Sequence, residues 1–69
     1  MKRQSVKSSN INSIGYDEDT QTLEVEFSSG DVYQYFNVPP KEYQALIRAS
    51  SHGKYLNQNV KDKYRFKRI

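Results

Sequence analysis

The sequence predicts a small α+β domain, in which a small antiparallel sheet carries two short helices on one face. The sheet is expected to contain a three-stranded meander plus a possible C-terminal edge strand, in the order β-β-β-α-α-β. Three patterns predict this fold: apolar residues alternate with polar ones in the first half, an apolar stripe of helical spacing follows two prolines, and alternation returns in residues 64–69. A chain of 69 residues allows one domain with a small core.

The N-terminal segment, residues 1–10, is polar and rich in serine and lysine, so we expect a flexible or loosely attached arm. The single domain is then expected to span residues 11–69. A first strand is predicted from Ile11 to Tyr16, where apolar residues alternate. Asp17-Glu18-Asp19-Thr20 follows as a turn, because aspartate side chains hydrogen-bond to the backbone just after them.

The clearest strand signal is the segment from Thr22 to Phe27. Leucine, valine and phenylalanine fall on one face and two glutamates on the other, as in a half-buried antiparallel strand. Ser28-Ser29-Gly30 closes a hairpin, and the partner strand is predicted from Val32 to Phe36.

The length of the hairpin loop decides where Tyr33 and Tyr35 point, because a one-residue change of register moves every side chain to the other face. A three-residue loop, with Gly30 left-handed, places both tyrosines beside Val25 on the inward face. A two- or four-residue loop turns them outward, as a platform on which unpaired bases could stack. Glycine at the third loop position slightly favours the first alternative.

The two helices are predicted after Val38-Pro39-Pro40, since proline ends a strand and suits the first turn of a helix. The first helix is expected over residues 41–49, with Tyr43, Leu46 and Ile47 as its apolar stripe. The second is expected from about Gly53 to Val60, capped by Ser51 or its neighbour.

Charge is distributed unevenly along the chain. Residues 1–37 carry three cations and six anions, whereas residues 38–69 carry eight cations and two anions. This asymmetry is typical of a protein with a polyanion or an acidic protein as partner. It is equally explained if the two halves complement each other across the folded core.

Residues that carry chemistry are scarce. The chain has no cysteine and one histidine, His52, so we expect no metal site, no cofactor and no enzymatic activity. His52 is interpreted as a turn or cap residue. No apolar stretch approaches transmembrane length, so we expect no membrane association and a cytoplasmic location.

The tyrosine-rich pattern resembles the KTSC family, a small bacterial and phage module that also occurs at the C-terminus of some lysyl-tRNA synthetases. The resemblance runs from about Ser9 to the end of the chain and is carried by Tyr16, Leu23 to Phe27, Gly30, Tyr33-Gln34-Tyr35, Val38-Pro39, Tyr43, Ser51-His52-Gly53, Tyr55-Leu56-Asn57 and Tyr64. It implies a stand-alone copy of a domain with no assigned reaction. RNA binding is suggested by the family's association with synthetases.

The function we predict is a non-enzymatic binding module for RNA or single-stranded nucleic acid. Cations attract phosphates and aromatic rings stack on bases, and the candidate residues of these two kinds are Lys54, Lys61, Lys63, Arg65, Lys67, Arg68, Tyr33, Tyr35, Tyr64 and Phe66. The alternative is a protein partner, with the chain acting as a bacterial or phage adaptor or inhibitor through the same tyrosine-rich face. In a simpler interpretation, the C-terminal rings pack on the core and the cations protect an edge strand.

Overall fold

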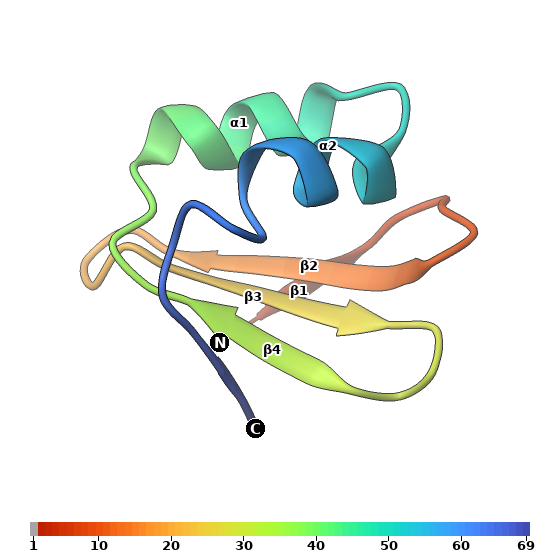
Figure 1. Cartoon of the computed structure of the whole chain (residues 1–69), viewed down its shortest axis with the longest axis horizontal. Helices are drawn as coiled ribbons and strands as arrows, with labels where there is room; N and C mark the ends of the chain where they lie inside the picture. The colour runs from red at the N-terminus through yellow and green to blue at the C-terminus, as the bar shows by residue number, and fades with distance from the viewer. Residues whose placement is uncertain (1) are drawn as a thin grey trace.

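The computed structural model describes residues 2–69 as one five-stranded antiparallel sheet with both helices on one face (Figure 1). The α+β class and the two helices are confirmed, and the sheet has one strand more than predicted. Strand order in the sheet follows chain order, from β1 at one edge to β5 at the other. The elements are β1 Arg3–Ser5, β2 Ile11–Asp17, β3 Thr22–Phe27, β4 Val32–Tyr35, α1 Pro40–Arg48, α2 His52–Asn59 and β5 Phe66–Arg68.

The extra strand, β1, lies in the segment for which the sequence analysis expects an arm. Arg3 pairs with Gly15, Gln4 with Ile14 and Ser5 with Ser13. The β1 side chains are exposed, so the backbone ladder, and not apolar burial, attaches this strand to β2. The expected order β-β-β-α-α-β is therefore corrected to four strands before the helices. Met1 lies outside the described residues.

The hairpin between β3 and β4 adopts the three-residue loop. The Phe27 N–H donates to the Asp31 carbonyl at 2.8 Å, and Gly30 has a φ of 97°, which favours glycine. Val25 consequently pairs with Tyr33, and Leu23 with Tyr35. The two tyrosines therefore lie on the helix-side face of the sheet, as the first of the two alternatives predicted.

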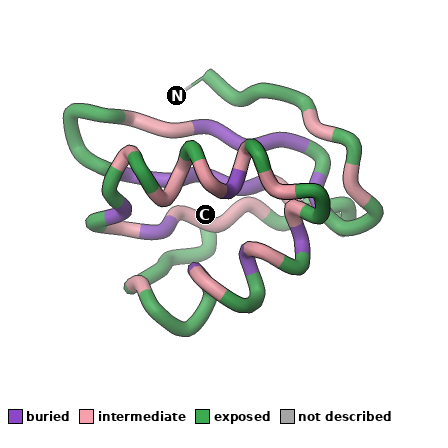
Figure 2. Tube along the Cα trace, turned by 90° about the horizontal axis from the view of Figure 1, so that it is seen from above, coloured by how far each residue is buried: buried purple, intermediate pink, exposed green. Residues whose placement is uncertain are grey.

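The core lies between this face and the helices. Its fully buried side chains come from β2, β3, the β4–α1 connection and the inward positions of both helices (Figure 2): Ile11, Ile14, Leu23, Val25, Val38, Leu46, Leu56 and Val60. Of the stripe predicted for the first helix, Leu46 is among them, whereas Tyr43 and Ile47 are partly buried and pack against this core. The predicted cap is confirmed too, since the Ser51 hydroxyl accepts the Lys54 N–H at 3.3 Å.

The opposite face of the sheet is polar but not fully solvated. The alternation of apolar and polar residues in β3 places Glu24 on this face, yet Glu24 is only 7% exposed. Gln34 donates to Glu24 Oε1 at 2.9 Å, and Arg3 forms an ion pair with Oε2 at 3.3 Å. The neighbouring Glu26 accepts a hydrogen bond from Ser13 at 3.0 Å. Partners on β1, β2 and β4 thus satisfy these carboxylates where they are shielded.

Candidate functional site

A groove of about 450 Å³ lies between α2 and the β3–β4–β5 part of the sheet. Four rings, from Phe27, Tyr33, Tyr35 and Phe66, contribute to its lining, and we refer to it below as the aromatic groove. Apart from Leu56, the residues on the α2 side and at the rim are small or polar. These are Gly53, Leu56, Asn57 and Lys61 on the helical side, with Asn10, Ser28, Ser29 and Asp31 at the rim.

The four rings form one connected cluster, in which Tyr33 contacts the other three. Phe27 meets Tyr33 edge to face, with ring centroids 5.5 Å apart. Phe66 is 5.7 Å from Tyr33 and 5.9 Å from Tyr35, measured between centroids. Antiparallel pairing explains this cluster, because Tyr33 and Tyr35 share a face of β4 and Phe66 is the β5 partner of Tyr35.

Exposure increases across the groove toward β5. Tyr35 is only 3% exposed, Tyr33 is half-buried, and Phe66 is 55% exposed. β5 is an edge strand, and all three of its residues are exposed, as the green C-terminal segment in Figure 2 shows. The groove is therefore a partly covered aromatic surface and not a closed core.

Gly53 helps to set the shape of the groove, since a Cβ added there would lie 3.3 Å from the Asn10 side-chain nitrogen. Asn10 is itself held by the β3–β4 turn, because its carbonyl accepts the Ser28 N–H at 2.8 Å. Glycine thus lets the start of α2 approach the β1–β2 connection closely. Both residues of this contact line the aromatic groove.

Charges of both signs flank the rings. Asp31 is the only acidic residue in the groove lining, and its carboxylate accepts a hydrogen bond from the Ser29 hydroxyl at 3.3 Å. Lys61 lines the groove just beyond the end of α2. Arg68 pairs with Tyr33 across β4 and β5, so its side chain leaves the sheet on the groove face.

The ten residues predicted as binding residues divide into three groups. Tyr33, Tyr35, Lys61 and Phe66 line the groove, and Arg68 joins their sheet face. Lys54 is exposed on α2, and Lys67 pairs with Gln34 and therefore lies on the opposite face of the sheet. The other three, Lys63, Tyr64 and Arg65, lie in the connection from α2 to β5, outside the groove.

Eight of the twelve residues that line the groove were missed by the sequence reasoning, among them Phe27, Asp31 and Asn57. The hairpin register could have indicated two of them, Phe27 and Asp31. With Phe27 bonded to Asp31, Asp31 shares a face with Tyr33, two residues along β4. Asn57 had no such signal, because its role depends on how α2 sits over the sheet.

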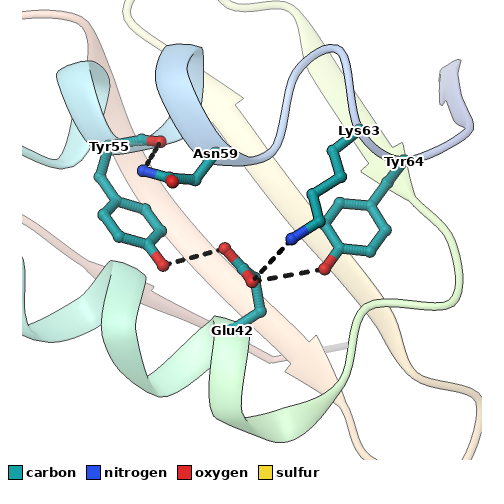
Figure 3. Close-up of polar contacts among 5 residues, drawn as sticks. All are labelled: Glu42, Tyr55, Asn59, Lys63 and Tyr64. Carbon is teal, nitrogen blue, oxygen red and sulfur yellow. Dashed lines mark hydrogen bonds and ion pairs between the residues drawn. The ribbon is translucent and has the colours of Figure 1, made fainter.

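Tyr64 belongs to a second cluster, centred on Glu42 (Figure 3). The Tyr55 hydroxyl donates to Glu42 Oε1 at 2.9 Å, and the Tyr64 hydroxyl donates to Oε2 at 3.3 Å. Lys63 Nζ lies 3.9 Å from the same Oε2. The Glu42 side chain is only 14% exposed, so this carboxylate connects α1 with α2 and with the segment before β5. We refer to these four residues as the Glu42 anchor.

Burial and the anchor both act on the tyrosine hydroxyls. Burial, then the hydrogen bond to Glu42 and its negative charge, raise the pKa of Tyr55 above its usual value of 10.0. Burial and the same carboxylate also raise the pKa of Tyr64. In the groove, burial and then the neighbouring Tyr33 raise the pKa of Tyr35. All three hydroxyls therefore stay protonated at neutral pH.

His52 is the first residue of α2, and its Nε2 lies 3.2 Å from the Ile47 carbonyl. This contact joins the start of α2 to the end of α1, in keeping with the structural interpretation of the histidine. Its Nδ1 is buried, and no residue in the range 2–69 provides it with a hydrogen-bond partner. Within residues 2–69, no three His, Cys, Asp or Glu side chains come together as a metal site would require. Neither helix in that range is long and apolar enough to cross a membrane.

Comparison with known proteins gives consistent results. The family model of the KTSC domain matches residues 7–64. An uncharacterized protein of Stutzerimonas stutzeri is 51% identical over 70 residues, which cover all of this chain and 99% of the relative. A lysine–tRNA ligase of Nostoc punctiforme is 42% identical over 59 residues, or 86% of this chain but only 10% of the ligase. The crystal structure of a KTSC domain protein from Yersinia pestis has a TM-score of 0.93 and 40% identity, and the match covers 99% of this chain and 96% of that protein.

Proposed function

This chain belongs to the KTSC domain family, and we propose that it is a non-catalytic binding module that takes single-stranded RNA into the aromatic groove. The observation that carries the proposal is the open row of rings. Phe66 leaves more than half of its surface exposed beside Tyr33, and Lys61 and Arg68 lie on the same side. Exposed rings bordered by cations combine base stacking with phosphate attraction.

The hydroxyl groups of the groove support this use. In the described part of the chain, the Tyr33 and Tyr35 hydroxyls have no protein hydrogen-bond partner, whereas Tyr16, Tyr55 and Tyr64 donate to protein oxygens. The groove tyrosines therefore combine apolar ring surface with hydroxyls that a ligand can engage. The volume of the groove falls in the range typical of small-ligand sites, which suits one or two bases better than a duplex.

The relatives provide a second, weaker line of support. A region similar to this chain occurs in a lysine–tRNA ligase, a protein whose name associates it with an RNA substrate. That region is a tenth of the ligase, so the ligase reaction itself is not transferred to this chain. Its presence there favours RNA over DNA as the polyanion.

An interaction with an extended peptide is the second candidate function, and the open edge of β5 favours it. β5 bonds to β4 through Arg65 and Ile69, which leaves the alternate backbone groups of Phe66 and Arg68 at the sheet edge. Such an edge can accept a further strand. The cations of β5 would select an acidic peptide.

The proposal is tested by fluorescence anisotropy with a labelled single-stranded RNA of ten nucleotides containing all four bases. Phe66→Ala should weaken binding by about 1–3 kcal/mol, the cost of one lost stacking partner. Ile69→Ala is the matched control, because Ile69 is as exposed as Phe66, lies three residues along, and faces the opposite side of the sheet. We expect near-unchanged affinity for that variant.

The cations are tested by salt titration of the same complex. Arg68→Ser should reduce the slope of log K against log salt by about 0.7, as expected for one lost phosphate contact on a single strand. Lys67→Ser, on the opposite face, should leave the slope as it is. Equal effects of both substitutions, or affinity of the Phe66→Ala variant equal to that of the wild type, would contradict RNA binding in the groove.

A further inference from the structure

One carboxylate stands out in the aromatic groove. Asp31 pairs with Phe27 across the hairpin and lies two residues before Tyr33, so its side chain is on the ring face at one end of the row. Its only hydrogen bond to another side chain in the described part of the chain comes from the Ser29 hydroxyl. No cation lies within ion-pair distance of it in that same part. The groove therefore presents a largely free, acceptor-only group beside a stacking surface.

We propose, on the basis of the RNA-binding function above, that the aromatic groove selects an unpaired guanine and that Asp31 is the residue that recognises it. A carboxylate offers two adjacent acceptor oxygens. Guanine has two adjacent donors on its Watson–Crick edge, N1–H and the exocyclic N2 amine. Adenine, cytosine and uracil each present an acceptor next to their donor on this edge. Only guanine can therefore satisfy both carboxylate oxygens.

The position of Asp31 suits this contact. Asp31 lines the same groove as Tyr33 and Phe66 and shares a face of the sheet with Tyr33, so it borders the space in which a base would stack on these rings. Unpaired bases are commonly read on their Watson–Crick edges while they stack on aromatic side chains. Lys61 lies across the groove on the helical side, where it can attract the phosphate of the same nucleotide.

A cationic side chain of a protein partner is the other ligand that suits a carboxylate next to aromatic rings. The surroundings disfavour it. Lys61 lines the same groove and Arg68 emerges beside Tyr33, so a bound cation would face like charges. A nucleotide, with an anionic phosphate and donor groups on its base, matches both kinds of charge.

The test uses five labelled hexaribonucleotides, each a run of uridines with one central position varied. The central base is guanine, inosine, adenine, cytosine or uracil, and affinity is measured by anisotropy at fixed salt. We expect guanine to bind about fivefold to a hundredfold more tightly than adenine, cytosine or uracil, the discrimination of one bidentate contact. Inosine should fall between, because it keeps N1–H and lacks the N2 amine.

Asp31→Asn is the decisive variant, since its amide presents one acceptor and one donor in nearly the same shape. It should remove the guanine preference while affinity for the all-uridine probe stays the same or rises slightly. Asp19→Asn removes an equal charge from the β2–β3 turn, at the opposite end of β3, and should keep the preference. Circular dichroism checks that both variants are folded.

The outcomes separate this inference from the function on which it rests. Equal binding of all five probes, or a guanine preference that survives Asp31→Asn, would overturn the guanine assignment and leave RNA binding intact. If none of the five probes binds, both the guanine assignment and the proposed RNA binding would be overturned. Asp31-dependent binding of a short arginine-containing peptide, with no RNA binding, would also overturn both and identify a protein partner.

Discussion

The Glu42 anchor and the aromatic groove use the same residue type in opposite ways. In the anchor, Tyr55 and Tyr64 direct their hydroxyls at one shielded carboxylate. In the groove, Tyr33 and Tyr35 contact neighbouring rings, and in the described part of the chain their hydroxyls donate to no protein atom. The difference shows that tyrosine content alone does not identify a binding surface. The hydrogen-bond partner of each hydroxyl separates structural tyrosines from those available to a ligand.

The largest effect expected is from Tyr35→Ala, which tests whether the groove is also part of the core. Tyr35 lines the groove but is almost fully buried, so loss of its ring should lower the free energy of unfolding by about 3–5 kcal/mol, through lost burial and a cavity. Tyr33→Ala removes a half-buried ring and should cost clearly less. Urea denaturation followed by circular dichroism measures both.

Tyr35→Phe is the control for this pair. It keeps the ring and removes a hydroxyl without a protein partner in the described residues, so the free energy of unfolding should change by less than about 0.5 kcal/mol. A large loss from Tyr35→Phe, or equal losses from the two alanine variants, would contradict the gradient of burial across the groove.

An intermediate effect is expected from Glu42→Gln in the anchor. The amide keeps one acceptor for the tyrosine hydroxyls but replaces the charged oxygen shared by Tyr64 and Lys63. Hydrogen bonds to charged groups contribute about 1.5–3 kcal/mol, and we expect a loss in this range, measured by the same denaturation. RNA affinity at a temperature where the variant is folded should stay unchanged. A selective loss of affinity would mean that the two regions are not independent.

The smallest effect expected is an alkaline loss of stability to which the anchor contributes. The folded state raises the pKa of Tyr55 and Tyr64, first through burial and then through Glu42, so it holds these protons more tightly than the unfolded chain does. The stabilisation is therefore complete below about pH 10 and is lost as pH rises further. Thermal melts at pH 8 to 11 should decline only in the upper part of this range. The decline should be shallower in Glu42→Gln, and an equal decline in that variant would argue against a role for the carboxylate.

Most of the fold was predictable because local patterns and tertiary structure agree. The glycine in the third loop position slightly favoured the hairpin register that the structure has, and Ser51, one of the two cap positions considered, caps the start of α2. β1 was not predictable from Arg3-Gln4-Ser5, because these side chains are exposed and a strand that buries no apolar side chain leaves no apolar pattern.

The candidate site was predictable only in part. The sequence identified aromatic residues and cations by type. It did not separate Lys67 from Arg68, because both are cations and the relevant difference is the face of the sheet from which each side chain projects. Tyr64 resembled a stacking residue until Glu42, 22 residues away in sequence, was found to accept its hydroxyl. Such distinctions arise from contacts between distant segments, which a period-two or helical pattern does not encode.

The order of strands in the sheet has a consequence for folding. β1 to β4 each pair with the strand next to them in sequence, across short connections. β5 also pairs with β4, but both helices lie between these two strands in the sequence. Short loops close at a lower entropic cost than long ones, so we expect the four-stranded meander to form early and β5 to dock late. For the same reason β5 should detach by local opening well below the free energy of global unfolding. Because Phe66 lies on β5, assembly of the ring surface would then be the last step in folding and the first to be reversed.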